Sequence, residues 1–306
     1  MMMVTPRMAS ASSATSSRPW PSTLPATRME FCTYTPPRTS THREMAITSP
    51  SMRAETLVLV GASEPVGFFA YPDVPSRLVA AHCEVVTLAP PGGEVSTALA
   101  LLADRFDAPH VHVPAGRAPD APSGALNAQS FAAAIAATLP EGAVISDESN
   151  TSGLHLYGAT TFAAPHRLLT LTGGSIGFGL PVAVGAAIGS GARVIALESD
   201  GSMMYTPQAL WTMAREGLDI TVVALSNRRY AILDFERQRV GATGAGEASE
   251  RLLSLDDPAI DLCGIARALG VPATAVTTAD ELVDALRRSF ATAGPSFIEV
   301  PLASAF

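Results

Sequence analysis

Lysine is missing from this chain, and cysteine is scarce. All 20 basic residues are Arg, and with 28 Asp and Glu residues they leave a net charge of −8, which argues against a nucleic-acid-binding surface. The three cysteines, Cys32, Cys83 and Cys263, form no Cys-x-x-Cys pair, so the sequence indicates neither a zinc site nor a disulfide framework. No apolar run approaches the length of a membrane span. Because unpaired cysteines persist in a reducing compartment, we expect a cytoplasmic protein.

Residues 1–53 lack the apolar periodicity that marks helices and strands. Ser, Thr and Pro account for 25 of these 53 residues, and six Arg stand against two acidic residues. Such a composition cannot bury enough apolar surface to offset the entropy that is lost on folding. We therefore expect a disordered leader. A misplaced start or reading-frame artefact is the origin that we favour, and an organelle transit peptide is the alternative.

From residue 54 onward, apolar runs alternate with amphipathic stretches, which is typical of an α/β protein with parallel strands. Residues 54–113 predict part of a small α/β domain, and the Pro-, Ala- and Gly-rich residues 114–124 predict a linker. Residues 125–306 predict a complete doubly wound, mostly parallel sheet. The predicted strands are 57–60, 84–88, 110–113, 143–146, 168–171, 193–197, 220–225 and 296–300. The predicted helices are 94–106, 127–139, 178–188, 207–217, 258–269 and 279–290.

Two neighbouring predicted strands end in side chains that carry oxygen. One leads into Asp200-Gly201-Ser202, and the next along the chain leads into Asn227. Because parallel strands end at the same edge of a sheet, we expect Asp200 and Asn227 to lie side by side. Carboxylate and amide oxygens suit Mg2+, and the N–H groups and hydroxyl of Gly201 and Ser202 suit a phosphate. Spacing alone leaves open the alternative that these are ordinary turn residues.

Two further loops carry the residue types that hold a ligand. Residues 147–153 are polar and lie between a predicted strand and a helix, where they either cap the helix or contact a phosphate. The glycines of residues 173–179 are spaced G-x-x-G-x-G, which differs from the dinucleotide-binding fingerprint but lets the backbone approach a ligand closely. On periodicity alone, Ile176 would belong to the core. The helix that follows is rich in Val, Ala and Gly, so we expect it to be buried.

The order of Asp200-Gly201-Ser202, a helix, a strand and Asn227 resembles the thiamine diphosphate-binding motif, Gly-Asp-Gly-(Ser/Ala) followed by Asn. The sequence departs from the motif at its first position, where Ser199 replaces Gly. A positive φ there would strain Ser199. The resemblance covers residues 125–301 and runs back more weakly to residue 54. Within the family, the chain is most similar to acetolactate synthase and benzoylformate decarboxylase.

The resemblance implies a thiamine diphosphate- and Mg2+-dependent enzyme that decarboxylates and ligates 2-oxo acids, as acetolactate synthase does. The alternatives are a benzoylformate decarboxylase-like enzyme and a catalytically silent fragment that binds cofactor or partners. The implied Mg2+ ligands are Asp200, Asn227 and the main-chain carbonyl of Arg229. The implied cofactor contacts are Asn150, Thr151, Gly201 and Ser202 at the diphosphate, Tyr230 beside it, Gly174 at the exocyclic amino group and Ile176 beneath the two rings.

The resemblance also implies a domain that this sequence does not show. In the family, a Glu of the pyrimidine-binding domain, normally in the partner subunit, activates the cofactor, and nothing in residues 1–53 resembles that domain. We therefore expect a truncated chain without a catalytic residue of its own, in which residues 54–113 are the tail of the middle domain. A homo-oligomer or a separate pyrimidine-domain subunit is the expected partner. We expect the charged, Gly-rich residues 235–251 to order only over bound cofactor.

Overall fold

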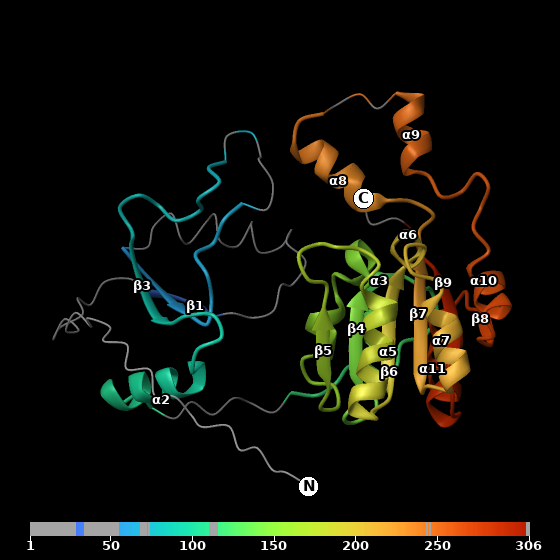
Figure 1. The fold of residues 1–306 in the computed structure, drawn as a ribbon, viewed down its shortest axis with the longest axis horizontal. Coiled ribbons are helices and arrows are strands. Elements are labelled where there is room, and N and C mark those ends of the chain that lie inside the picture. Colours follow the sequence, from blue (N-terminus) through green and yellow to red (C-terminus); the bar gives the residue numbers. More distant parts are fainter. Residues whose placement is uncertain are drawn as a thin grey trace, which may run out of the picture.

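Two parallel sheets organise the chain. The computed structural model describes residues 55–67, 72, 74–109, 116–242, 244 and 246–303, together with the backbone of residues 29–33. A three-stranded sheet and a six-stranded sheet lie in different parts of the molecule (Figure 1). Every pair of neighbouring strands within these sheets is parallel. The predicted α/β class and the mostly parallel sheet are confirmed.

The smaller sheet has the order β1-β2-β3 and is followed by helix α2 (Val95–Arg105). Its strands are β1 (Met29–Thr33), β2 (Thr56–Val60) and β3 (Glu84–Ala89). The central strand β2 is buried along Leu57, Val58, Leu59 and Val60, as a continuous apolar run between two strands should be. Strand β1 was not predicted from the sequence. The rest of residues 1–53 and the predicted strand 110–113 lie outside the described residues, so the expected disorder of the leader stays a prediction.

The larger sheet has the order β5-β4-β6-β7-β9-β8. Its strands are β4 (Val144–Glu148), β5 (Arg167–Thr170), β6 (Val194–Ser199), β7 (Ile220–Ser226), β8 (Ala273–Ala275) and β9 (Ser296–Pro301). The predicted strands of this part are all present, and β4 runs two residues further than predicted. β8 was missed, because three residues are too few to show a period. The order makes β4, β6 and β7 direct neighbours.

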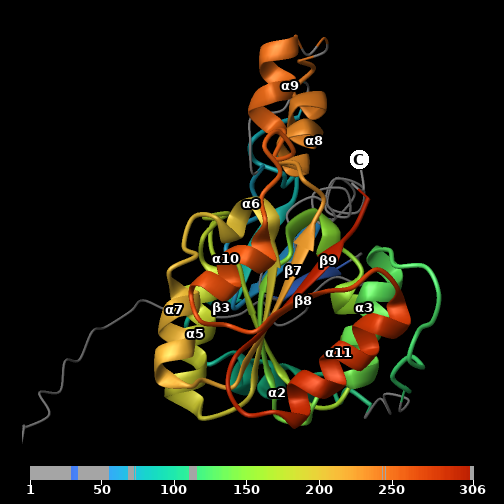
Figure 2. The same cartoon turned by 90° about the vertical axis from the view of Figure 1, so that its right-hand side faces the viewer.

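Helices cover both faces of the larger sheet (Figure 2). Helices α3 (Ala128–Thr138) and α11 (Ala279–Ala291) cover one face. Helices α5 (Gly179–Ser190), α7 (Ala209–Glu216) and α10 (Leu262–Ala268) cover the other. Each face has its own apolar core, because successive strand residues point to opposite sides: in β6, Leu197 belongs to the first core and Ala196 to the second. The predicted doubly wound arrangement is confirmed.

Capping residues set several helix ends. The Asn127 side chain accepts hydrogen bonds from the first turn of α3, and Thr278 and Glu281 form a capping box at the start of α11. Helix α10 begins at residue 262 rather than at the predicted residue 258, because the Asp261 side chain accepts a hydrogen bond from the Gly264 N–H (2.7 Å) and caps the helix there. Among the described residues, no helix is both long and apolar enough to cross a bilayer.

The structure contains helices that the sequence analysis missed. Helices α8 (Ala231–Arg239) and α9 (Glu247–Leu253) occupy most of residues 235–251, the segment that was expected to order only over bound cofactor. They project beyond the ends of the strands (Figures 1 and 2). Short helical turns also follow β4 and β6, namely η2 (Asn150–Gly153), α4 (Leu156–Thr160) and α6 (Asp200–Met203). Since α9 buries no residue and α8 only two, neither helix shows an apolar period.

One buried leucine and one exposed leucine test whether β6 lies within the apolar core. Leu197 is 0% exposed in β6, whereas Leu252 is 78% exposed on α9. We expect Leu197→Ala to lower the free energy of unfolding by about 2–5 kcal/mol, because it opens a cavity in the core. The matched control, Leu252→Ala, should change it by less than about 0.5 kcal/mol. Urea unfolding followed by circular dichroism measures both, and equal losses would contradict this packing.

Candidate functional site

Loops that follow β4, β6 and β7 meet at one edge of the larger sheet. Asp200 comes directly after β6 as the first residue of α6, and Asn227 comes directly after β7. The main-chain N–H of Arg228 donates to Asp200 Oδ2 (2.5 Å), and the N–H of Gly201 donates to Asp200 Oδ1 (2.9 Å). The structure therefore brings the Asp200 carboxylate against the loop that contains Asn227.

The Asp200 carboxylate is suited to a cation. It is 3% exposed, and both described hydrogen-bond partners of its oxygens are main-chain N–H groups. Burial raises the pKa of Asp200, while the N–H donors of Arg228 and Gly201 oppose this rise. A buried carboxylate without a basic side chain as partner is costly, and a bound cation would stabilise its charged form.

The loop after β7 supplies two further oxygens. The Asn227 Oδ1 atom accepts a hydrogen bond from the Arg229 N–H (3.0 Å). Arg229 and Ser254 form an isolated antiparallel bridge, and its two main-chain hydrogen bonds run through the residues on either side of Arg229. The bridge therefore does not occupy the Arg229 carbonyl oxygen. An amide oxygen and a main-chain carbonyl thus lie on one short loop beside Asp200.

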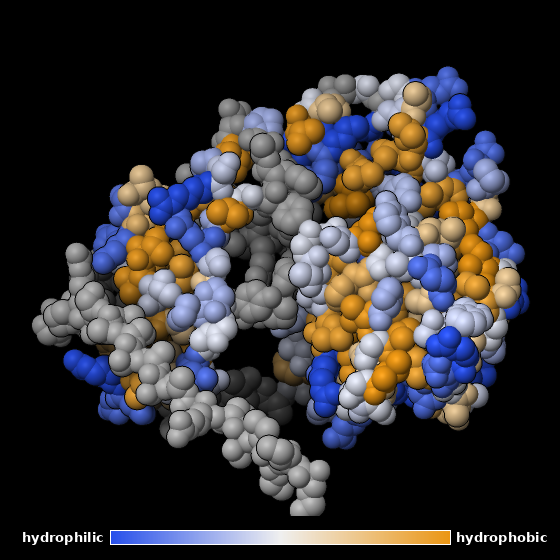
Figure 3. Space-filling model, viewed as in Figure 1, coloured by the Kyte–Doolittle hydropathy of each residue, from blue (hydrophilic) through white to orange (hydrophobic). Residues whose placement is uncertain are grey.

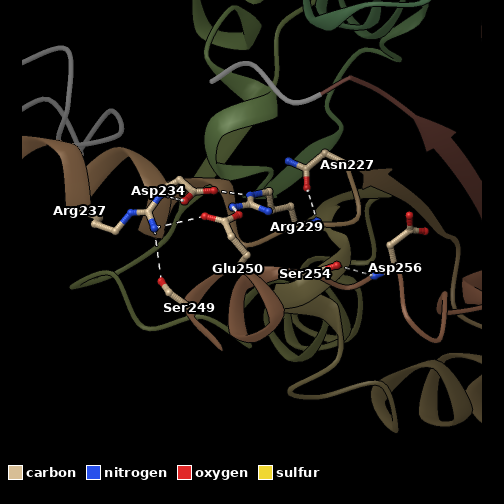
Figure 4. A network of polar contacts seen from close by, with 8 residues as sticks. All are labelled: Asn227, Arg229, Asp234, Arg237, Ser249, Glu250, Ser254 and Asp256. Carbon is tan, nitrogen blue, oxygen red and sulfur yellow. Dashed lines mark hydrogen bonds and ion pairs between the residues drawn. The ribbon is translucent and has the colours of Figure 1, made fainter. Parts of the chain in front are cut away.

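An ion-pair network connects the Arg229 side chain to α8 and α9 (Figure 4). The Arg229 guanidinium pairs with Asp234 of α8 and with Glu250 of α9 (2.5 Å). Arg237 pairs with the same two carboxylates, at 2.9 Å from Asp234 and 3.4 Å from Glu250. The hydrogen bond from Arg229 lowers the pKa of Asp234. The network joins α8 and α9 to the loop after β7, and this explains why two helices with almost no apolar core are ordered.

Asn150 ties the loop after β4 to the first turn of α6. Its Nδ2 atom lies 2.9 Å from the Glu148 carbonyl, 3.2 Å from Ser199 Oγ and 2.9 Å from Ser202 Oγ. Its φ is 48°, a left-handed conformation that Asn tolerates better than most residues. Thr151 follows and is buried. The four residues that were expected at a diphosphate, Asn150, Thr151, Gly201 and Ser202, therefore lie on two loops in direct contact.

Ser199 adopts an ordinary extended conformation, with φ −93° and ψ 150°. The strain that a positive φ would cause is therefore absent. The Ser199 hydroxyl donates to the Glu148 carbonyl (3.2 Å). The replacement of Gly by Ser thus adds a hydrogen bond between the loops after β4 and β6.

A close contact explains one glycine position, and a left-handed backbone conformation explains another. A Cβ atom added to Gly201 would lie 2.4 Å from Cε1 of Tyr230, so the Tyr230 ring covers Gly201 and would have to move to admit a larger residue. In the glycine loop (residues 173–179), Gly174 has φ 70°, which favours glycine. Ile176, in the same loop, is partly buried.

Two buried carboxyl groups, Glu148 and Glu198, were not predicted from the sequence. Glu148, at the end of β4, accepts hydrogen bonds from the N–H groups of Gly177 (2.6 Å) and Gly179 (2.5 Å). Glu198, in β6, is 0% exposed, and a Cβ atom added to Gly179 would lie 1.9 Å from its Oε1 atom. Within the described part of the chain, neither carboxyl oxygen of Glu198 has a hydrogen-bond donor. The only signal in the sequence is an acidic residue at the end of an apolar run.

We infer that Glu148 and Glu198 together carry one negative charge. Burial and the nearby Glu148 raise the pKa of Glu198 well above its usual value. Burial also raises the pKa of Glu148, but N–H groups at the start of α5 oppose this rise. We therefore place the charge on Glu148, at the positive end of the α5 dipole, and the proton on Glu198.

A conventional metal cluster is not present in the described ranges: they contain no group of three or more His, Cys, Asp or Glu side chains that could hold a metal. The Asp200, Asn227 and Arg229 set has one carboxylate and two neutral oxygens. Mg2+ is often held by one or two carboxylates together with water and the phosphates of a ligand. This donor set therefore fits Mg2+ that binds together with a diphosphate.

Comparisons with known proteins converge on one family. Residues 151–300 match the family model described as the C-terminal TPP binding domain of thiamine pyrophosphate enzymes. A relative from Mycobacterium tuberculosis, named "Putative acetolactate synthase large subunit IlvX", is 51% identical over 252 residues, which are 81% of this chain and 48% of the relative. Benzoylformate decarboxylase of Pseudomonas aeruginosa is 33% identical over 58% of this chain and 33% of its own length. The chain thus spans about half the length of the first relative and about a third of the second.

Solved structures show the same fold. An X-ray structure of a "putative thiamin diphosphate-dependent enzyme" from Mycobacterium smegmatis superposes with a TM-score of 0.60 at 27% identity, over 81% of this chain and 49% of that one. A thiamine diphosphate-dependent 4-hydroxybenzoylformate decarboxylase from Rhodococcus jostii RHA1 superposes with a TM-score of 0.65 at 24% identity, over 81% of this chain and 49% of that one. The second likeness concerns the fold alone.

Glu198→Gln tests the shared charge, because Gln keeps the shape of a protonated Glu. A Glu whose pKa is raised by folding stabilises the fold fully below its unfolded pKa, 4.5. It loses that contribution as the pH rises towards its pKa in the folded protein. Between about pH 5 and pH 8 we expect the free energy of unfolding to fall more steeply in the wild type than in the variant, by at most about 1.4 kcal/mol per pH unit. Urea unfolding measures it, and parallel pH profiles would contradict a protonated Glu198.

Proposed function

The chain belongs to the thiamine pyrophosphate enzymes, and we propose that it binds thiamine diphosphate through Mg2+ at the carboxyl ends of β6 and β7. One observation carries this proposal: the buried Asp200 carboxylate accepts hydrogen bonds from the Arg228 and Gly201 N–H groups. This contact brings the Asp200 motif together with the loop that contains Asn227. We assign Asp200, Asn227 and the carbonyl of Arg229 as the Mg2+ ligands.

The charges at the site favour a metal-dependent mode of binding. A diphosphate brings several negative charges next to the Asp200 carboxylate. The two arginines of the adjacent loop are already paired, Arg228 with Asp256 (2.9 Å) and Arg229 with Asp234 and Glu250. Neutralisation therefore depends on the cation and on N–H groups. This is the role that we give to Mg2+.

The loops around Asp200 supply the remaining contacts. Asn150, Thr151, Gly201 and Ser202 would hold the diphosphate, and Tyr230, which covers Gly201, would lie beside it. Gly174 would accept a hydrogen bond from the exocyclic amino group through its carbonyl, and Ile176 would pack beneath the two rings. When bound, thiamine diphosphate supplies an electron sink for the decarboxylation of a 2-oxo acid. The protein residues bind and orient it.

We propose decarboxylation followed by ligation of a second 2-oxo acid, in the manner of acetolactate synthase. The 51% identity to a relative of that name supports this reaction. Simple decarboxylation is the second candidate, because a benzoylformate decarboxylase is 33% identical over 58% of this chain. Product analysis with one 2-oxo acid, and with a second one as acceptor, separates the two, since only the ligase forms a product that contains both carbon skeletons.

A partner is expected on the face that carries α5 (Figure 3). This helix was predicted to be buried, but the prediction is wrong for one of its sides: Pro181, Gly185 and Ile188 are exposed, Ile188 by 64%. Small and apolar residues that line one side of a helix are suited to close contact with another subunit. We propose a homo-oligomer or a separate subunit, with the activating Glu on a pyrimidine-binding domain. We assign no catalytic residue to the described part of the chain.

Asp200→Ala tests the assignment of the metal ligands. We expect Mg2+-dependent binding of thiamine diphosphate to weaken at least about 100-fold, because the cation loses its only protein carboxylate. Asp284→Ala, which removes an exposed carboxylate from α11, is the matched control and should bind as the wild type does. Isothermal titration calorimetry with Mg2+ and thiamine diphosphate measures the affinities. Unchanged binding by Asp200→Ala would refute the site.

A further inference from the structure

Glu148 connects the loops of the candidate site through both its side chain and its main chain. Its carboxylate accepts hydrogen bonds from the N–H groups of Gly177 (2.6 Å) and Gly179 (2.5 Å). Its main-chain carbonyl accepts from Asn150 Nδ2 (2.9 Å) and Ser199 Oγ (3.2 Å). One residue therefore anchors the glycine loop with its carboxylate and the two loops of the diphosphate contacts with its carbonyl.

The glycine loop depends on this anchor for its position. Its residues 173–175 are exposed, and the Ser175 N–H makes a hydrogen bond of 3.3 Å to the Thr172 carbonyl. The Thr206 hydroxyl donates to the Gly177 carbonyl (3.0 Å). Glu148 and Thr206 therefore both hold the loop at Gly177, close to the exposed residues that precede it.

We propose that Glu148 is a positioning residue, whose carboxylate places Gly174 and Ile176 against the ring system of thiamine diphosphate. This inference rests on the proposed function. A carboxylate offers an acceptor oxygen to each of the two N–H groups, whereas Gln offers one acceptor and a competing NH2 group. The substitution leaves the Glu148 main-chain carbonyl in place, so the contacts to Asn150 and Ser199 remain. The carboxylate therefore controls the ring contacts separately from the diphosphate contacts.

Glu148→Gln tests this separation with two probes. One probe is Mg2+ with thiamine diphosphate, and the other is Mg2+ with inorganic pyrophosphate, which lacks the rings. We expect thiamine diphosphate to bind about ten-fold more weakly, the loss of one hydrogen bond to a charged group, and pyrophosphate to bind unchanged. Calorimetry measures both affinities. The near-ultraviolet circular dichroism of the bound aminopyrimidine should weaken in the variant at saturating ligand.

Thr206→Val provides a second route if Glu148→Gln fails to fold. Val keeps the shape of Thr but cannot donate to the Gly177 carbonyl, so the glycine loop loses its second anchor while Glu148 is untouched. We expect the same selective loss of thiamine diphosphate binding. Thr161→Val is the matched control, because the exposed Thr161 hydroxyl donates only to the Tyr157 carbonyl (3.0 Å) in the described hydrogen bonds. It should change neither affinity.

The outcomes distinguish this inference from the proposed function. Selective weakening of thiamine diphosphate in Glu148→Gln and Thr206→Val supports the positioning role. Equal weakening of both probes, or no weakening of either, overturns it and leaves the cofactor site in place. A wild type that binds both probes with the same affinity also overturns it. A wild type that binds neither probe overturns the proposed function itself.

Discussion

The parallel pairing of β4, β6 and β7 is the constraint on which the site depends. Neighbouring strands that run in one direction end at one edge of the sheet, and this geometry brings together Asn150, Asp200 and Asn227. Strands β6 and β7 are mostly apolar and buried, so a polar group at the end of either strand is costly unless it finds a partner at that edge. Main-chain N–H groups and ion pairs satisfy most of these polar groups. The Asp200 carboxylate and the carbonyl of Arg229 provide oxygens that would coordinate a cation.

The sequence predicted the sheet better than the segments around it. Strands β6 and β7 are nearly continuous apolar runs, as strands covered on both faces must be, and α11 carries a capping box that marks its start. Helices α8 and α9 could not be found in this way. They are held by ion pairs among Arg229, Asp234, Arg237 and Glu250, and they bury too few apolar side chains to show a helical period.

The residues of the candidate site also differ in whether the sequence could predict their positions. Motif spacing predicted that Asp200 lies beside the loop that contains Asn227, and the structure agrees, because that placement needs only the direction and order of the strands. The pairing of Glu148 with Glu198 could not be predicted. An acidic residue at the end of an apolar run usually reaches solvent, and only the packing of Gly179 against Glu198 shows that the side chain is enclosed. The left-handed φ of Asn150 is likewise a property of the folded loop.

The most direct test of the metal-bridged diphosphate site is to locate the cation itself. Crystals of the protein grown with Mn2+ in place of Mg2+ and with thiamine diphosphate would show the metal by its anomalous scattering. We predict one peak, bound by an oxygen of Asp200, by Asn227 Oδ1 and by the Arg229 carbonyl at about 2.0–2.2 Å, with the diphosphate completing the shell. A metal peak elsewhere, or a diphosphate bound away from Gly201 and Ser202, would contradict this assignment.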